Sequence, residues 1–387
     1  MKQLKFLSAA ILLFVFTAAS AQTRTNKKDS KYEFTVEKEI GSTDVKNQGS
    51  TGTCWSFSAL SFLEAEVKRM NKSDVALSEM FIARMAYQMK AEKYLRMMGK
   101  TNFSQGGAFH DVMNVIKEYG IVPRSTYTGL IYDQKRFHHT EMEKVLTDLL
   151  NTTLEMKEGH LNPAWKPAFN SILDAYLGAV PATVPAGTKS LNPNAYASSL
   201  GIIPDDYIEV SSFSHHPFYS KFVLEVPDNW AWNSVYNVPL DEFAKIIEAA
   251  ISNGYTVAWA ADVSEKGFSH KNGLAIVPDG DWENMSKEER EAAWNAPVKQ
   301  KTITQSVRQE AFDNLSTQDD HGMQITGMAK DQNGTRYYIV KNSWGDESNE
   351  CGGYFYCSEA YVLYKTTSIM VHKKALPADI AAKLGIK

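Results

Sequence analysis

Cys54 stands between a short glycine-containing loop and an apolar run that extends to Val67 with helical spacing. This order predicts a sulfur atom at the N-terminus of a helix, where the positive end of the helix dipole stabilises a negative charge. A thiolate in such a position is a nucleophile at neutral pH. A single cysteine is more often a small buried hydrophobe. The chemistry of Cys54 therefore depends on partners elsewhere in the chain.

A cysteine nucleophile needs a base that accepts its proton, a group that orients the base, and donors for the oxyanion. His321 precedes a predicted strand and Asn342 follows the next one. A hairpin turn at Asn333-Gly334 would bring the two side chains together, with the Asn342 carbonyl fixing the imidazole tautomer. Gln48, six residues before Cys54, can present its amide beside the Cys54 backbone N–H. These two donors would form an oxyanion hole.

The ordered motifs resemble those of the papain-like cysteine proteases. The resemblance is carried by Gln48 and Cys54, by His321 before a strand, and by Asn342-Ser343-Trp344-Gly345. It implies a Cys–His–Asn peptidase that works through an acyl-enzyme, with no cofactor and no metal.

In that family the backbone of a glycine pair lines the substrate cleft, which gives Gly106 and Gly107 a role in substrate binding. A turn before a helix is the alternative explanation of this pair. Trp344, from the third motif, would shield the His321–Asn342 hydrogen bond from water.

Cys54 and His321 are 267 residues apart, whereas papain-type enzymes have about 130–150 residues between these positions. The extra residues lie mostly within 125–240. This enlargement is similar to the bleomycin hydrolase and aminopeptidase C branch, which implies an aminopeptidase and a hexameric ring. The C-terminal arm that carries a terminal carboxylate into the cleft of that branch is expected to be truncated or replaced here. Two alternatives therefore stay open: an endopeptidase or dipeptidyl-type peptidase with an open cleft, and a peptide-binding relative without catalysis.

The order of the predicted elements indicates the fold. Helical spacing is found in the first third of the chain, at 54–71, after Ser78 and at 109–119, and again within 140–178 and at 241–252. Strands are predicted at 255–260, 324–328, 335–341, 354–357 and 367–372. Helices first and antiparallel strands later predict an α+β fold. Residues 22–44 are predicted to be extended or loosely ordered, and 180–227 to contain few helices.

The resemblance divides this α+β fold into two lobes of the papain-like kind. A helical lobe is expected at about 33–125 and a lobe similar to an antiparallel β-barrel at 241–375. A large insertion at 126–240 separates them, and a tail at 376–387 follows.

Residues 1–21 have a positive start, a short apolar run and a small-x-small end, which is typical of a secretory signal peptide. We therefore expect an exported protein, periplasmic or secreted, with the peptidase domain at 22–387. No apolar run is long enough for a stable membrane insertion. The formal net charge is −4 and no basic run stands out, so peptides rather than nucleic acids are the expected partners.

The other cysteines and the histidine pairs are interpreted as structural. Cys351 and Cys357 flank a predicted strand about 20 Å long, and a disulfide needs Cα atoms within about 7 Å. All three cysteines are therefore expected to be thiols. His138-His139 and His215-His216 suggest a metal site, but no second ligand pair at zinc spacing accompanies them. Both pairs are predicted to lie in solvated loops, and the acid-rich run 281–291 to form a solvated surface helix.

Overall fold

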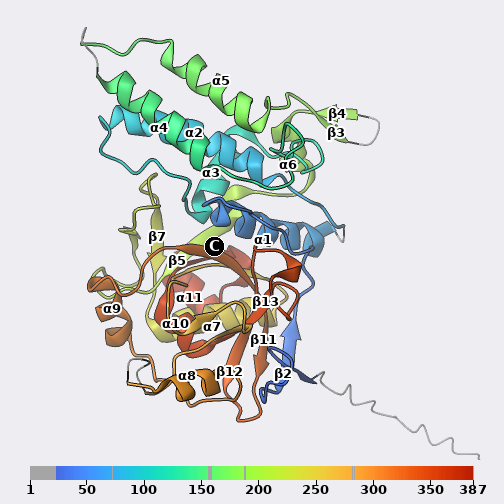
Figure 1. Cartoon of the computed structure of the whole chain (residues 1–387), viewed down its shortest axis with the longest axis vertical. Coiled ribbons are helices and arrows are strands. Elements are labelled where there is room, and N and C mark those ends of the chain that lie inside the picture. The colour runs from blue at the N-terminus through green and yellow to red at the C-terminus, as the bar shows by residue number, and fades with distance from the viewer. Residues whose placement is uncertain are drawn as a thin grey trace, which may run out of the picture.

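The computed structural model describes residues 23–71, 73–155, 159–186, 189–280, 282 and 284–386. The predicted signal peptide lies outside these residues. The first part of the described chain is mainly helical and the later part combines strands with helices, which confirms the α+β class. Figure 1 shows a helical lobe at one end of the molecule and a sheet lobe at the other, with α1 (Cys54–Asn71) between them.

The helical lobe begins with three helices at the predicted positions: α1, α2 (Glu79–Arg96) and α3 (Phe109–Tyr119). Ser78 caps α2, because its Oγ accepts a hydrogen bond from the Phe81 backbone N–H at 3.0 Å. The helices α4 (Thr140–Leu154) and α5 (Trp165–Leu177) follow and pack on α2. The first part of the predicted insertion therefore enlarges the helical lobe, as Figure 1 also shows.

The sheet lobe contains one large, mostly antiparallel sheet with the order β6-β7-β5-β14-β8-β11-β12-β13-β10-β9. Its strands are β5 (Tyr207–Ser211), β6 (Lys221–Val223), β7 (Ser234–Asn237), β8 (Val257–Ala261), β9 (Phe268–Ser269), β10 (Leu274–Ala275), β11 (His321–Lys330), β12 (Arg336–Lys341), β13 (Tyr354–Ser358) and β14 (Thr366–His372). Two further strands, β1 (Thr23–Arg24) and β2 (Phe34–Glu39), branch off at β11.

The sheet does not close into the expected barrel within the described part of the chain, because its path ends in the unpaired edges of β6 and β9. The reason lies in the second part of the predicted insertion. The strands β5, β6 and β7 extend the sheet beyond β14, where a barrel would have to close.

The sheet is covered on both faces, and the side chains of β8 show how. Val257, Trp259 and Ala261 belong to the core beside α7 (Leu240–Ser252). Ala258 belongs to the core of the helical lobe, and Ala260 packs against it. Successive side chains of a strand point to opposite faces. Helix α1 and helix α7 therefore lie on opposite faces of the same strand.

Short elements complete the fold. The remaining helices are α6 (Pro193–Ser199), α8 (Lys287–Ala293), α9 (Gln305–Asp313), α10 (Glu359–Lys365) and α11 (Ala378–Lys383). A two-stranded ribbon is formed by β3 (Val184–Ala186) and β4 (Lys189–Leu191). No helix among the described residues is both long enough and apolar enough to cross a membrane. All three cysteines are unpaired, as expected.

Two segments differ from their sequence predictions. The stretch expected to be extended or loosely ordered contains β2, which pairs with β11 and buries Phe34. Residues 180–227 contain α6 and several strands rather than mainly irregular chain. Strands β2 and β5 pair with strands distant in the sequence, and local spacing does not report such pairing.

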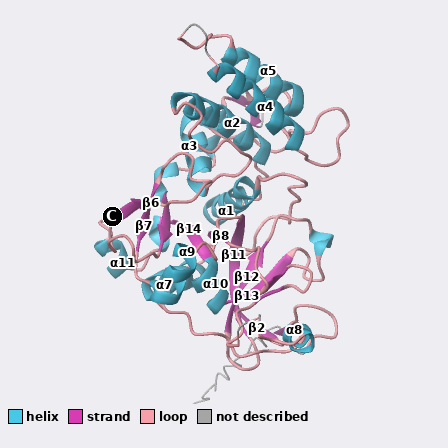
Figure 2. Ribbon diagram, turned by 60° about the vertical axis from the view of Figure 1, so that its left-hand side comes forward, coloured by secondary structure: helices cyan, strands magenta, loops and turns pink. Residues whose placement is uncertain are grey.

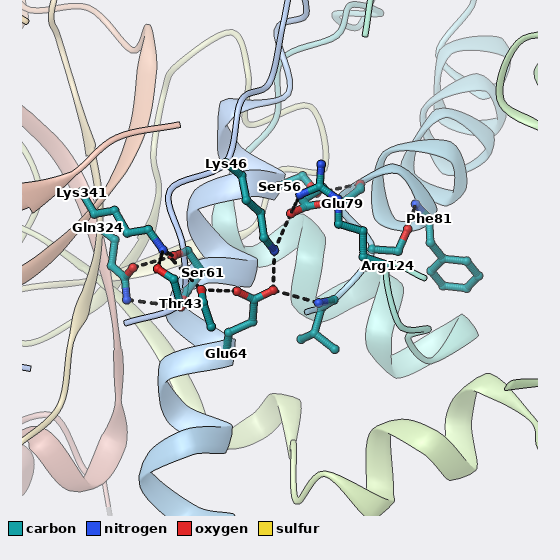
Figure 3. A network of polar contacts seen from close by, with 12 residues as sticks. Thr43, Lys46, Ser56, Ser61, Glu64, Glu79, Phe81, Arg124, Gln324 and Lys341 are labelled. Atoms are coloured by element: carbon teal, nitrogen blue, oxygen red, sulfur yellow. Dashed lines mark hydrogen bonds and ion pairs between the residues drawn. The ribbon is translucent and has the colours of Figure 1, made fainter. Parts of the chain in front are cut away.

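A buried polar network joins α1 to the sheet lobe (Figure 3). Lys341, the last residue of β12, donates hydrogen bonds to the Thr43 carbonyl and, at 2.8 Å, to Ser61 Oγ on α1. Glu64, also on α1, accepts hydrogen bonds from Lys46 Nζ and Thr43 Oγ1, both at 2.5 Å. The network therefore fixes the end of β12 against the helix that begins at Cys54.

Candidate active site

The start of α1 places Cys54 in a cavity between the two lobes. The wall is formed by α1, by residues 107–110, by β5, β7, β8, β11 and β14, by residues 224–229 after β6, and by residues 319–320 before β11. The free volume is about 30 Å³, enough for roughly two water-sized groups. Cys54 and His321 both line it.

Gly322 allows β11 to approach the first turn of α1. A Cβ atom at this position would lie 2.7 Å from Ser58 Oγ and 3.3 Å from Trp55 Cα. Any larger residue would force the strand away from the helix. The glycine after His321 therefore lets the imidazole stand beside the cavity that contains Cys54.

The structure brings His321 and Asn342 together through the hairpin of β11 and β12, in which Gln324 is paired with Lys341. The Nε2 atom of His321 lies 2.8 Å from Asn342 Oδ1. A carbonyl oxygen only accepts, so Nε2 carries the hydrogen and Nδ1 keeps a lone pair. Burial lowers the pKa of His321, and the hydrogen bond that His321 donates to Asn342 partly offsets this.

His270 and Trp344 complete the surroundings of this pair. Asn342 Nδ2 donates to His270 Nδ1 at 3.2 Å, which holds Oδ1 toward His321. The Trp344 ring packs on the His321 ring with 4.7 Å between centroids, in agreement with a shielding role. The sequence around His270 contains no signal for this contact, because the residue lies far from the other motifs.

The Cys54 thiol is strongly desolvated, and burial raises its pKa to about 12. The charges of Asp228 and Asp319 also raise the pKa, while the backbone amides of Gly322 and Trp55 lower it. Burial therefore outweighs the helix terminus that the sequence suggested as the activating feature. A thiolate requires a positive charge beside it, and a protonated His321 is the lining group that can provide one.

Gln48 is held by the residue that follows Asn342. Ser343 Oγ donates to Gln48 Oε1 at 2.6 Å, and Gln48 Nε2 donates to the Thr51 carbonyl at 2.8 Å. An amide nitrogen has two hydrogens, so one remains for an oxyanion. Gln48 itself is not among the residues that line the cavity.

The two predicted substrate-binding glycines have different surroundings. Gly107 lines the cavity. Gly106 is covered by the carboxylate of Asp228, since a Cβ atom on this glycine would lie 2.0 Å from Asp228 Oδ2. The Gly106 carbonyl also accepts a hydrogen bond from Lys90. Asp228 therefore covers the side of Gly106 on which a Cβ atom would lie.

Asp228 belongs to none of the sequence motifs. Its only local signal is a turn at Pro227-Asp228-Asn229.

The C-terminal residues pack elsewhere. Ile380 and Leu384 are buried in the core beside α7, and Lys383 Nζ contacts Glu242 Oε1 at 2.5 Å. In Figure 2 the C-terminal end lies beside α11, away from α1. None of the described residues from 373 to 386 lines the cavity around Cys54.

His215, His216 and Glu225 offer ligand atoms that all lie within 4.8 Å of one another, so this group could hold a metal ion. Glu225 accepts hydrogen bonds from Nε2 of both His215, at 3.1 Å, and His216, at 2.9 Å. Gln309 Nε2 donates to His215 Nδ1 at 2.9 Å. Without a metal, these contacts place the His215 proton on Nε2, and a metal ion bound there would displace that proton.

The prediction of a solvated loop is wrong for His139, which is 2% exposed beside Tyr87. Its partner His138 is exposed.

Comparisons with known proteins indicate the family of the chain. The model of the Peptidase C1-like family matches residues 5–161 and 188–386. Aminopeptidase C of Streptococcus thermophilus is 22% identical, over 93% of this chain and 86% of that protein. Bleomycin hydrolase of Mus musculus is 22% identical, over 88% of this chain and 82% of that protein.

The solved structure of pepw from Lactobacillus rhamnosis is similar to this one, with a TM-score of 0.72 and 21% identity. The similarity covers 91% of this chain and 84% of that chain. It confirms the papain-like α+β fold that the motifs predict.

Proposed function

Because the chain belongs to the Peptidase C1-like family, we propose that this cysteine peptidase is an aminopeptidase with Cys54 as its nucleophile. The observation that carries the proposal is one cavity that contains Cys54 and His321, with Asn342 Oδ1 only 2.8 Å from His321 Nε2. This arrangement leaves Nδ1 of His321 as the nitrogen that can accept a proton.

In the proposed mechanism, His321 Nδ1 takes the proton of the Cys54 thiol, and the resulting thiolate attacks the carbonyl carbon of the peptide bond. The Cys54 backbone N–H and Gln48 Nε2 donate to the oxyanion. The imidazolium of His321 then returns the proton to the departing amine. Water, with its proton accepted by His321, hydrolyses the acyl-enzyme and releases the acid and the free thiol.

Two features support an exopeptidase rather than an endopeptidase. The curated relatives above are named aminopeptidase C and bleomycin hydrolase and match most of the chain. The cavity beside Cys54 is small, and residues 224–229 form part of its wall. An extended chain on both sides of the scissile bond needs a longer groove. The endopeptidase, the dipeptidyl-type enzyme and the non-catalytic relative are therefore alternatives that the experiment below distinguishes.

Export to the periplasm or the medium belongs to the same proposal, and it rests on the signal-like residues 1–21. The hexameric ring, the domain boundaries and the absence of a cofactor and a metal stay predictions.

The proposal is tested with an aminoacyl-coumarin amide and its N-acetylated counterpart. The wild-type enzyme is expected to cleave the first and to leave the second essentially intact. C54A should fold like the wild type, by circular dichroism, and cleave neither. Turnover by C54A would refute the assignment of the nucleophile, and equal cleavage of both substrates would favour the endopeptidase. Failure of the folded wild type to alkylate at Cys54 or to cleave either amide would favour the non-catalytic relative.

A further inference from the structure

Asp228 is held in the cavity wall by contacts with the helical lobe. The segment that contains it connects β6 with β7, in the sheet lobe, and reaches across to α2 and α3. Trp230 Nε1 donates to Asp111 Oδ2 on α3 at 2.8 Å, and Lys93 Nζ on α2 donates to the Ala231 carbonyl at 3.1 Å. These two contacts give the Asp228 carboxylate a defined position between the lobes.

The Asp228 carboxylate can accept further hydrogen bonds. Asn102 Nδ2 donates to Oδ1 at 3.1 Å, whereas Oδ2 lies over Gly106 and has no hydrogen-bond donor among the residues that the structure describes. A carboxylate accepts up to about four hydrogen bonds. Asp228 is mostly buried and lines the same cavity as Cys54. A donor that enters this cavity therefore finds an acceptor with unused lone pairs.

The charges around the cavity favour a cation as that donor. Among the residues that the structure describes, the lysine whose charge acts on Asp228 is Lys90, and its ammonium group is bonded to the Ser104 and Gly106 carbonyls. His110, the other basic side chain of the wall besides His321, lies 3.1 Å from Glu209. A positive group inside the cavity thus meets a carboxylate that lacks a dedicated ion-pair partner in the wall.

We propose that the Asp228 carboxylate binds the α-ammonium group of the peptide substrate. This inference rests on the proposed function and deepens it. The α-ammonium nitrogen of an amino-terminal residue is two bonds from the scissile carbonyl carbon, and that carbon must lie against the Cys54 sulfur. A small cavity that contains both the thiol and a carboxylate suits this short separation. The substrates are then peptides with an unmodified amino terminus, and N-acetylated and pyroglutamyl peptides are rejected.

The position of Asp228 over Gly106 also limits how a longer substrate can bind. An upstream residue would need the backbone of this glycine as an edge to pair with, and Asp228 occupies that space. The Asp228 side chain therefore blocks residues upstream of the substrate's amino terminus and also binds the charge of that terminus.

The test compares D228N with E225Q, a matched control that neutralises a carboxylate on the same segment outside the cavity. D228N is expected to lower kcat/KM for the free-amino substrate by about 10- to 100-fold, the usual value of a hydrogen bond to a charged group. Its rate with the acetylated substrate should not fall, so that the ratio between the substrates decreases. E225Q should keep the wild-type ratio.

Folding is checked by thermal melting and by alkylation of Cys54. If D228N does not fold, D228A tests the same point with a smaller side chain. A wild-type ratio in a folded Asp228 variant would overturn the role of Asp228 and leave the aminopeptidase intact. Equal cleavage of both substrates by the wild type would overturn both proposals.

Discussion

His270 Nδ1 accepts a hydrogen bond from Asn342 Nδ2 at 3.2 Å, on the side of the amide opposite His321. The other His270 nitrogen, Nε2, lies 2.7 Å from Ser348 Oγ and carries the hydrogen in this tautomer. Burial and the nearby His321 lower the pKa of His270 to about 4, so its Nδ1 remains an acceptor at neutral pH. The Asn342 amide is therefore oriented from both ends, and His270 is a positioning residue for His321.

Replacing His270 tests this positioning. H270A should lower kcat about 10-fold or more with little change in KM, because a rotated Asn342 amide no longer holds the reactive His321 tautomer. H270N offers a carbonyl oxygen as acceptor and is expected to recover part of the loss. Steady-state kinetics between pH 4 and 9 measure both variants. Equal losses in H270A and H270N, together with lowered melting temperatures, would indicate a purely structural residue.

The Cys54 thiol should depend on His321 for its ionisation. Burial raises the pKa of Cys54 to about 12 when no positive charge stands beside it. Iodoacetamide reacts with the thiolate, so H321A should slow alkylation of Cys54 at pH 7 by at least about 100-fold and move its onset to alkaline pH. Mass spectrometry of the labelled peptide follows the reaction. Wild-type alkylation kinetics in H321A would mean that the helix terminus alone ionises the thiol.

The contrast between predicted and unpredicted parts of the site has a physical cause. Helices α1 to α3 and strands β8 and β11 to β14 lie where the sequence places them, because their apolar spacing is a local property. Asn342 and His321 meet through a hairpin with a turn signal that is also local. Asp228 and His270 reach the site only through the folding of distant segments, and no spacing in the sequence reports such contacts. The open sheet was missed for the same reason, since β5 pairs with the distant β14, and β7 and β6 add to the sheet beyond β5.

The buried network around Glu64 should contribute strongly to stability. Glu64 is fully buried and accepts hydrogen bonds from Lys46, Thr43 and the Leu77 backbone N–H. E64A leaves the Lys46 charge with a single buried partner and should lower the free energy of unfolding by about 3–5 kcal/mol. E64Q, which keeps a carbonyl acceptor, should cost less. Urea denaturation followed by tryptophan fluorescence measures both, and an unchanged E64A midpoint would contradict this role.

The raised pKa of Asp319 should make the free energy of unfolding of the protein depend on pH. Burial, with the nearby charge of Asp228, raises the pKa of Asp319 to about 7, so the folded state binds this proton more firmly than the unfolded state does. Stability from this group is therefore present below about pH 4 and decreases as the pH rises to 7. D319N removes the titration, and its gain in unfolding free energy over the wild type should be about 2–3 kcal/mol larger at pH 8 than at pH 5. Denaturation at the two pH values measures the difference; an equal gain at both would contradict the raised pKa.

Substitution of Gly106 tests the role of Asp228 independently, because it moves the Asp228 carboxylate without removing it. A Cβ atom on Gly106 would lie 2.0 Å from Asp228 Oδ2, so G106A must displace this side chain. We expect G106A to lose preference for the free-amino substrate in the same direction as D228N, although every charge is retained. The double variant G106A/D228N should be no worse than the poorer single variant, since both changes act through one contact. The ratio of kcat/KM values for the free and acetylated substrates measures all three. Additive losses in the double variant would mean that Gly106 contacts the substrate directly, as the sequence alone suggested.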